Sequence, residues 1–268
     1  MNDMKHTHEM PDVQSLIDSR NLEIEQVGVR GVQFPVQVQG ETQIMHSIGR
    51  CNLNVALPAH KKGTHMSRLM SLLQAFQEPI AAHSMLALVK QLLPLLEAPR
   101  GNIEISYPHF VKKAAPISGI DSLMDYQVTW NAFAEVHNDH LHAANYLKVV
   151  VPVMSLCPCS KEISEYGAHN QRSHVTIEVR LKNDADLVVE DLIRIAESQA
   201  SSELWGLLKR VDEKFVTEHS YDNPKFVEDL ARDVATRVAQ LPGIESYEVE
   251  VENFESIHNH SAFARIVS

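Results

Sequence analysis

Residues 123–136, "LMDYQVTWNAFAEV", decide the fold class of this chain. Every second position carries an apolar or aromatic side chain: Tyr126, Val128, Trp130, Ala132, Ala134 and Val136. Side chains of a strand point alternately to its two faces, so this period of two predicts a strand with one buried face. Residues 102–111, "NIEISYPHFV", carry strand-type residues just before it. The two segments therefore predict neighbouring strands of an antiparallel sheet.

Upstream of this pair the hydrophobic period changes twice. Residues 23–39 and 43–57 alternate as strands do, with Leu53, Val55 and Leu57 on one face. Residues 66–76 and 81–97, separated by Pro79, instead repeat their apolar positions at intervals of three and four, which is typical of helices. The first half of the chain is therefore predicted to be β-β-α-α-β-β.

The second half repeats this order. The predicted strands and helices are strands 144–156 and 173–182, helices 187–201 and 224–241, and strands 244–254 and 260–267. Asn223 before Pro224 predicts the start of the last helix, and "LPG" at 241–243 predicts its end. Residues 208–224, "LKRVDEKFVTEHSYDNP", are expected to form a polar loop. We expect an α+β fold with antiparallel sheets side by side and helices on one face.

The predicted division is an N-terminal extension at 1–20, a first module at 21–140 and a second module at 141–268, within one continuous domain. Modules of this kind usually complete their sheets by association, so we expect a homo-oligomer. The net charge of −11, from 24 basic and 35 acidic residues, argues against a nucleic-acid or anionic-membrane binder. The longest apolar runs are shorter than the roughly 20 residues that span a bilayer, and no signal peptide is visible, so we expect a cytoplasmic protein.

One basic stretch interrupts this acidic composition. No Asp or Glu occurs between Thr42 and Gln77, and "AHKKGTHMSR" at 59–68 contains Lys62, His65 and Arg68. This stretch is either a basic surface loop or a site for a compact anion such as a phosphate chain. The glycine-rich nucleotide motifs G-x-G-x-x-G and G-x-x-x-x-G-K-[ST] are absent, so side chains and turn amides would have to hold the anion.

The chemistry is concentrated in residues 156–169, "LCPCSKEISEYGAH". Cys157 and His169 supply a thiolate and an imidazole, two of the three protein ligands of a catalytic metal site. A second Cys/His pair, which a structural zinc site would need, is missing. The third ligand is expected from the segment 208–224, which offers Asp212, Glu213 and Glu218. Two other interpretations remain open: a buried Cys-Pro-Cys turn, or a cysteine nucleophile beside a histidine.

Two further histidine clusters also resemble ligand sets. "HNDHLH" at 137–142 lies between two predicted strands, where a hairpin turn is the expected structure. His258 and His260 precede the last strand, and His258 has either a packing role or an acid/base role.

Five blocks resemble the type IB GTP cyclohydrolase I family of bacterial folate biosynthesis. They are "KGTHMSR", "SLCPCSKEISEYGAHNQRSH", "LLKRVDEKFVTE", "NPKFVED" and "NFESIHNHSA". With their connecting segments the resemblance covers nearly the whole chain, except "HNDHLH" and "MKHTHEM". It implies the tunnelling fold (T-fold), built from two β-β-α-α-β-β modules per subunit. It also implies a homotetramer with active sites at subunit interfaces.

The same resemblance implies the conversion of GTP and water to 7,8-dihydroneopterin triphosphate and formate. It implies a divalent metal ion, zinc, manganese or another, bound by Cys157, His169 and Glu213. It places Glu228 on the guanine edge, where a carboxylate accepts two hydrogen bonds. It places His258 where a proton is transferred as the imidazole ring of guanine opens.

Two groups of residues are less closely tied to the family. Cys159 is a proton donor, an alternative ligand or a redox-sensitive neighbour of the site. Lys62, His65 and Arg68 are assigned to the triphosphate, more from their charge than from the family.

Three other functions remain compatible with parts of the sequence. They are an archaeal-type GTP cyclohydrolase with a cyclic phosphate product, a T-fold nitrile reductase that uses a thiol and NADPH, and a non-catalytic metal-binding protein suggested by fifteen histidines. The chain shows no match to the lysine-rich motif that characterises the reductase.

Overall fold

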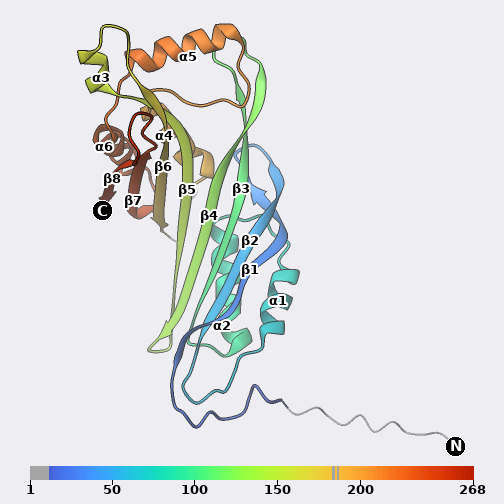
Figure 1. Cartoon of the computed structure of the whole chain (residues 1–268). Helices are drawn as coiled ribbons and strands as arrows, with labels where there is room; N and C mark the ends of the chain where they lie inside the picture. The colour runs from blue at the N-terminus through green and yellow to red at the C-terminus, as the bar shows by residue number, and fades with distance from the viewer. Residues whose placement is uncertain (1–11, 183–184, 186) are drawn as a thin grey trace, which may run out of the picture.

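Eight strands form one antiparallel sheet in which each strand pairs with the next one in the chain (Figure 1). The computed structural model describes residues 12–182, 185 and 187–268. The strands are β1 (Ile24–Gln39), β2 (Ile44–Leu57), β3 (Arg100–Ala114), β4 (Asp121–His137), β5 (His140–Leu156), β6 (Asn170–Leu181), β7 (Ile244–Asn253) and β8 (Ala262–Val267). The predicted antiparallel arrangement is confirmed, and β1 and β8 are the two edges.

Six helices accompany the sheet. They are α1 (Met66–Ala75), α2 (Ala82–Leu96), α3 (Pro158–Ile163), α4 (Val189–Gln199), α5 (Arg210–Asp222) and α6 (Val227–Val238). Buried side chains of α1, α2, α4 and α6 join those of the strands in one hydrophobic core, whereas α3 and α5 lie at one end of the sheet (Figure 1). The helices predicted for both halves are therefore present. None of the helices in the described part of the chain has the length and apolarity of a membrane span.

The strand β4 follows the predicted period over most of its length. From Tyr126 to Ala134 the alternate side chains are at most 2% exposed. Val136 breaks the pattern at 45% exposed, because it lies next to the hairpin that joins β4 to β5. Asn138 and Asp139 form that turn, both with positive φ, as in the two-residue turns that suit hairpins. The predicted turn at 137–142 is confirmed, and its histidines are exposed at the tip.

The predicted loop at 208–224 is wrong, because most of it forms the helix α5. Val216 is the only buried apolar residue of α5, so the sequence lacks the apolar stripe that usually indicates a helix. The predicted cap at Asn223 is wrong as well, since α6 begins at Val227 after Phe226. Asn223 instead ends α5, where its Nδ2 donates to the carbonyl of His219 at 2.7 Å.

The predicted module boundary at residue 140 falls in the hairpin between β4 and β5, two strands that pair along most of their length. The division into modules stays a prediction. Of the predicted extension, residues 1–11 lie outside the described residues. Ile17 forms an isolated bridge with Lys61, so the described part of the extension lies against the segment that follows β2.

Candidate functional site

Cys157 and His169 face each other across two paired strands. The last residue of β5, Leu156, pairs with the first residue of β6, Asn170. One step further the backbone N–H of Cys157 donates to the carbonyl of His169 at 3.1 Å. Side chains directly opposite each other on antiparallel strands have Cβ atoms about 5 Å apart. The fold therefore holds the thiol and the imidazole together although twelve positions separate them in sequence.

The local structure at Cys157 leaves its sulfur half-buried and accessible. Cys157 caps the short helix α3, and its Sγ accepts a hydrogen bond from the backbone N–H of Ser160 at 3.4 Å. Pro158 fits the first turn of that helix because a proline there loses no helical hydrogen bond. Cys159 lies on α3 and is exposed.

The ring of His169 is oriented by its neighbours. Its Nδ1 lies 3.1 Å from Oε1 of Gln171 and 3.4 Å from Oγ of Ser256. No hydrogen bond within the described residues uses its Nε2. A histidine whose Nδ1 is held by a hydrogen bond in this way has the arrangement that metal-ligating histidines commonly show.

A cavity of about 300 Å³ opens beside this pair. Its lining brings together four predicted site residues: Cys157, His169, Glu228 and His258. Glu228 lies in the first turn of α6. Just before that helix, the backbone N–H of Lys225 donates to the carbonyl of Leu156 at 3.0 Å, which holds the start of α6 beside the end of β5. Residues that are far apart in the sequence therefore meet at one end of the sheet.

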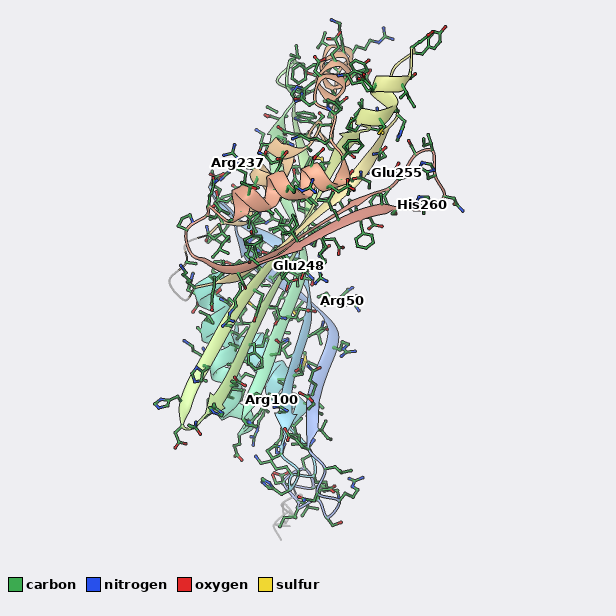
Figure 2. The ribbon with its side chains drawn as sticks, turned by 90° about the vertical axis from the view of Figure 1, so that its left-hand side faces the viewer. Arg50, Arg100, Arg237, Glu248, Glu255 and His260 are labelled. Atoms are coloured by element: carbon green, nitrogen blue, oxygen red, sulfur yellow. The ribbon has the colours of Figure 1, made fainter. Side chains whose placement is uncertain are left out.

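The segment between β7 and β8 forms another wall of the cavity. Figure 2 shows Glu255 and His260 there, and both line the cavity with His258. His258 is exposed, and its ring stacks on that of His260 with 5.2 Å between the centroids. An exposed imidazole at the mouth of a cavity is placed to exchange protons with a bound molecule and with water.

Several polar residues that line this cavity are not assigned from the sequence, among them Gln171, Asn253 and Glu255. Gln171 follows His169 by two positions, so the alternation of a strand puts both side chains on one face. That signal was available, but the predicted strand began only at residue 173. Glu255 belongs to the block "NFESIHNHSA", in which only the histidines were predicted to be site residues.

Lys62, His65 and Arg68 lie at the opposite end of the sheet. The register aligns Val55 with Gly101, Gly101 with Ala134, and Ala134 with Ala143. Cys157 is fourteen residues beyond Ala143, so about 45 Å of strand separates the two ends. Figure 2 shows Arg100 toward one end of the sheet and Glu255 and His260 toward the other. The fold does not bring the basic segment to the cavity of its own chain.

Most of the basic segment already has partners. Nζ of Lys61 lies 2.9 Å from a carboxylate oxygen of Glu97, and a guanidinium nitrogen of Arg68 donates to the carbonyl of Leu95 at 3.0 Å. Both contacts satisfy groups at the end of α2, where cations are stabilising. Nε2 of His65 lies 3.4 Å from a carboxylate oxygen of Asp12. Lys62 is exposed and enters no ion pair among the described residues.

Glu213 is also remote from the cavity. It lies exposed in the first turn of α5, whereas the last turn contacts α3 through Lys161, whose Nζ donates to the carbonyl of Tyr221. Eight residues of helix separate Glu213 from Tyr221, about 12 Å along the axis. Within the described residues no three His, Cys, Asp or Glu side chains lie close enough to hold a metal ion.

Asp212, the neighbour of Glu213, anchors α5 to the β3–β4 connection. It is fully buried and accepts hydrogen bonds from the backbone N–H groups of Ile117 and Ser118 and from Oγ of Ser118. A further bond comes from the backbone N–H of Lys209 at 2.8 Å. Burial favours the neutral acid, but these donors outweigh it and hold the pKa of Asp212 well below its usual range. Asp212 therefore has a structural role, and of the three candidate acids only Glu213 and Glu218 are exposed.

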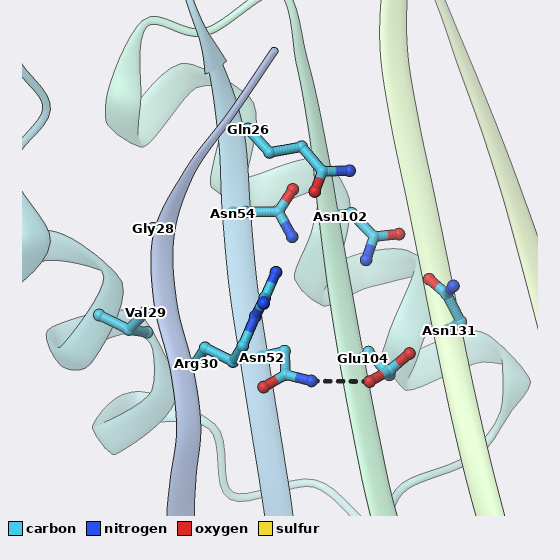
Figure 3. Close-up of a pocket in the computed structure, with 9 residues that line it drawn as sticks. All are labelled: Gln26, Gly28, Val29, Arg30, Asn52, Asn54, Asn102, Glu104 and Asn131. Atoms are coloured by element: carbon cyan, nitrogen blue, oxygen red, sulfur yellow. Dashed lines mark hydrogen bonds between the residues drawn. The ribbon is translucent and has the colours of Figure 1, made fainter. Parts of the chain in front are cut away.

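A larger cavity of about 560 Å³ lies on the open face of the sheet in the first half of the chain (Figure 3). Amide side chains dominate its lining, including Gln26, Asn54 and Asn102. Nδ2 of Asn52 donates to a carboxylate oxygen of Glu104 at 2.7 Å. No thiol or imidazole lines it, so it lacks the soft ligands and the nucleophile that the first cavity offers.

A profile described as "Type I GTP cyclohydrolase folE2" matches residues 10–264. The chain belongs to this FolE2 family. A "GTP cyclohydrolase FolE2" of Polynucleobacter asymbioticus is 60% identical over 259 residues, which cover 96% of this chain and 95% of the relative. One of Ralstonia nicotianae is 55% identical over 266 residues, which cover 99% and 97%. The resemblance seen in the sequence blocks is confirmed.

Solved structures show what fold the FolE2 chain has. A highly active mutant of the urate oxidase of Bacillus sp. TB-90 aligns with a TM-score of 0.58 at 9% identity and covers 91% of this chain and 99% of its own. The uricase of Arthrobacter globiformis aligns with a TM-score of 0.52 at 10% identity, covering 91% and 92%. At such identities the likeness concerns the fold alone, and the predicted tunnelling fold is confirmed.

Proposed function

We propose that this FolE2 chain is a metal-dependent GTP cyclohydrolase. It hydrolyses GTP to 7,8-dihydroneopterin triphosphate and formate, the first step of tetrahydrofolate biosynthesis. One observation carries the assignment: Cys157 and His169 are held face to face in a cavity that Glu228 and His258 also line. Relatives 55–60% identical over nearly their whole length are named GTP cyclohydrolase FolE2.

The donor set suits a divalent metal ion. Sγ of Cys157 is a soft ligand, Nε2 of His169 is a borderline one and the carboxylate of Glu213 adds a hard oxygen, a mixture compatible with zinc or manganese. When bound, such an ion supplies a water of lowered pKa, so that hydroxide is available at neutral pH to attack C8 of guanine. A thiolate ligand needs a reducing compartment, so we place the protein in the cytoplasm.

Glu228 and His258 divide the remaining work in the cavity. The carboxylate of Glu228 accepts hydrogen bonds from N1–H and the 2-amino group of guanine, which adenine cannot offer in the same way. Its place in the first turn of α6 stabilises the negative charge that this pairing needs. His258 donates a proton to N7 when hydroxide adds to C8, and the proton of the new C8 hydroxyl then passes to N9 as the C8–N9 bond breaks.

A complete site needs more than one copy of the chain. The strands β1 and β8 leave two open sheet edges, and exposed apolar side chains such as Ile257 and Phe263 lie beside the cavity end. Open edges are prone to pair with another chain. We infer a homotetramer in which Lys62, His65, Arg68 and Glu213 reach the cavity from a neighbouring subunit, because none of them lines the cavity of its own chain.

The assignment is tested by incubating the metal-loaded protein with GTP. We expect formate and, after oxidation, a fluorescent neopterin, with both products abolished by a chelator and restored by zinc or manganese. Absence of both products from protein that carries one metal ion per chain would refute the proposed reaction. Release of a cyclic phosphate product in place of the triphosphate would indicate the archaeal type of reaction.

A further inference from the structure

Four polar side chains form a buried hydrogen-bonded chain beneath the cavity. Gln171, Ser155, Ser173 and Asn253 are 7%, 1%, 0% and 4% exposed, and they come from the strands β5, β6 and β7. Nε2 of Gln171 donates to Oγ of Ser155 at 3.2 Å, the two serine oxygens lie 2.6 Å apart, and Oγ of Ser173 donates to Oδ1 of Asn253 at 2.7 Å. At its other end Oε1 of Gln171 meets Nδ1 of His169 at 3.1 Å.

The direction of this chain follows from counting protons. Oδ1 of Asn253 can only accept, so the one hydroxyl proton of Ser173 goes to it. The hydroxyl proton of Ser155 then goes to Ser173, or to the same Oδ1 at 3.4 Å, and a lone pair of Ser155 is left to accept from Gln171. The amide of Gln171 therefore turns its NH₂ group toward Ser155 and its carbonyl oxygen toward His169.

This orientation selects one form of the His169 ring. A carbonyl oxygen can only accept, so the hydrogen bond requires a proton on Nδ1 of His169. In a neutral imidazole the other nitrogen, Nε2, then carries the lone pair with which a metal ion is bound. The opposite tautomer would place a proton on Nε2 and leave two acceptors facing each other at 3.1 Å.

We propose that Gln171 is a positioning residue that sets the tautomer of His169 for metal binding. The inference rests on the proposed role of His169 as a ligand, and Gln171 itself touches neither metal nor substrate in this role. Ser256 is the other polar neighbour of Nδ1, at 3.4 Å, but its hydroxyl can donate or accept and so selects neither tautomer.

Metal affinity, measured on apoprotein by competition with a chelating dye, tests the proposal. For Gln171→Leu we expect zinc and manganese affinity to fall about 10- to 100-fold, the usual effect of losing a group that orients a ligand. Gln171→Glu keeps an acceptor for the Nδ1 proton, so we expect affinity within about threefold of the unmodified protein. Ser256→Ala removes the other neighbour of the same nitrogen and is the matched control, with affinity again within about threefold.

The tautomer is read separately, without metal or GTP. Solid-state NMR of protein labelled with ¹⁵N-histidine distinguishes a protonated from an unprotonated Nδ1, and a His169→Gln variant assigns the signal. We expect a protonated Nδ1 and an unprotonated Nε2 in the apoprotein and in Gln171→Glu. Ser155→Ala keeps Gln171 and His169 but removes the acceptor that orients the amide, so we expect signals of both tautomers.

Each outcome bears on one proposal. A proton on Nε2 in the apoprotein would overturn the inference. So would unchanged affinity in Gln171→Leu, a loss in Gln171→Glu equal to that in Gln171→Leu, or a larger loss in Ser256→Ala than in Gln171→Leu. If Gln171→Leu does not fold, Ser155→Ala and Gln171→Glu still decide the matter. Failure of the unmodified protein to bind metal or convert GTP would instead refute the proposed function. The NMR experiment would still report the tautomer of His169, because it uses neither metal nor GTP.

Discussion

The sheet end that holds Cys157 and the end that holds Lys62 differ in what their side chains already contact. At the first end Cys157 and His169 are oriented by Ser160 and Gln171, yet the sulfur and one ring nitrogen stay available. At the second end Lys61 and Arg68 are engaged with the end of α2, whereas Lys62 is exposed and forms no ion pair with a described residue.

The two ends carry complementary chemistry at a distance that one nucleotide cannot bridge. One end offers metal ligands, a carboxylate for guanine and an imidazole for proton transfer. The other end offers positive charges for the phosphates of GTP. With about 45 Å of strand between them, a single GTP meets both only if two chains associate with opposite ends together. Catalysis by this chain therefore depends on its assembly with other copies.

Replacing Cys157 tests the ligand end and has the largest expected effect. In Cys157→Ala we expect loss of bound metal and a fall in kcat/KM of about a thousandfold or more, the scale seen when a group acting in the transition state is removed. Metal analysis and the pterin assay measure the two quantities. Cys159→Ala is the matched control for the neighbouring, exposed thiol, and it should keep one metal ion per chain. Equal metal loss in both variants would contradict the assignment of Cys157 as the ligand.

Mixing two inactive variants tests whether the site is shared between chains. If Cys157 and Glu213 of one site come from different subunits, co-expressed Cys157→Ala and Glu213→Ala chains form some intact sites. Random pairing gives one intact site in about four, so activity should rise from background to about a quarter of that of the unmodified protein.

The control pairs Cys157→Ala with His169→Ala. These residues are neighbours in the same chain, so no mixture of the two variants contains an intact site. Recovery of activity in this control would show that the gain in the first mixture does not come from sites shared between subunits. No recovery with Glu213→Ala would place Glu213 in the same chain as Cys157, and α5 would then have to move.

The sequence predicted the parts of this molecule whose signal is local. From Tyr126 to Ala134 burial follows a period of two, and the cross-strand pair of Cys157 and His169 was recognised from ligand chemistry. The helix α5 was not predicted, because it buries only one apolar residue, Val216. It is held in place by hydrogen bonds from Ile117 and Ser118 to Asp212, nearly a hundred positions away in the sequence.

The parts of the site that depend on strand register could not be predicted from the sequence. Gln171 and Asn253 are ordinary polar residues until the pairing of β5, β6 and β7 places them in one chain with Ser155 and Ser173. The separation of Lys62 from Cys157 is likewise set by the alignment of four strands. No composition or spacing along the sequence records that alignment.

Lys62 tests the basic end, with a smaller expected effect. In Lys62→Ala we expect KM for GTP to rise about tenfold with kcat little changed, because one exposed charge contact to the triphosphate is lost. The rise should shrink at high salt, where such contacts are screened. Lys90, exposed on α2, provides the matched control Lys90→Ala, which should leave KM unchanged. Metal content should be normal in both variants, and a loss of metal in Lys62→Ala would contradict the division between the two ends.

Replacing Asp212 tests whether α5 positions Glu213, and it has the smallest expected effect on metal affinity. It accepts four hydrogen bonds that hold the first turn of α5 and thereby the position of Glu213. In Asp212→Ala we expect metal affinity to fall about threefold, the scale of losing a helix cap, with kcat falling in proportion when metal is limiting. Asp222→Ala, at the exposed far end of α5, is the matched control. If Asp212→Ala kept full affinity while proteolysis showed a loosened α5, Glu213 would not depend on its helix for position, and the carboxylate ligand would have to be sought at Glu228 or Glu255 in the cavity itself.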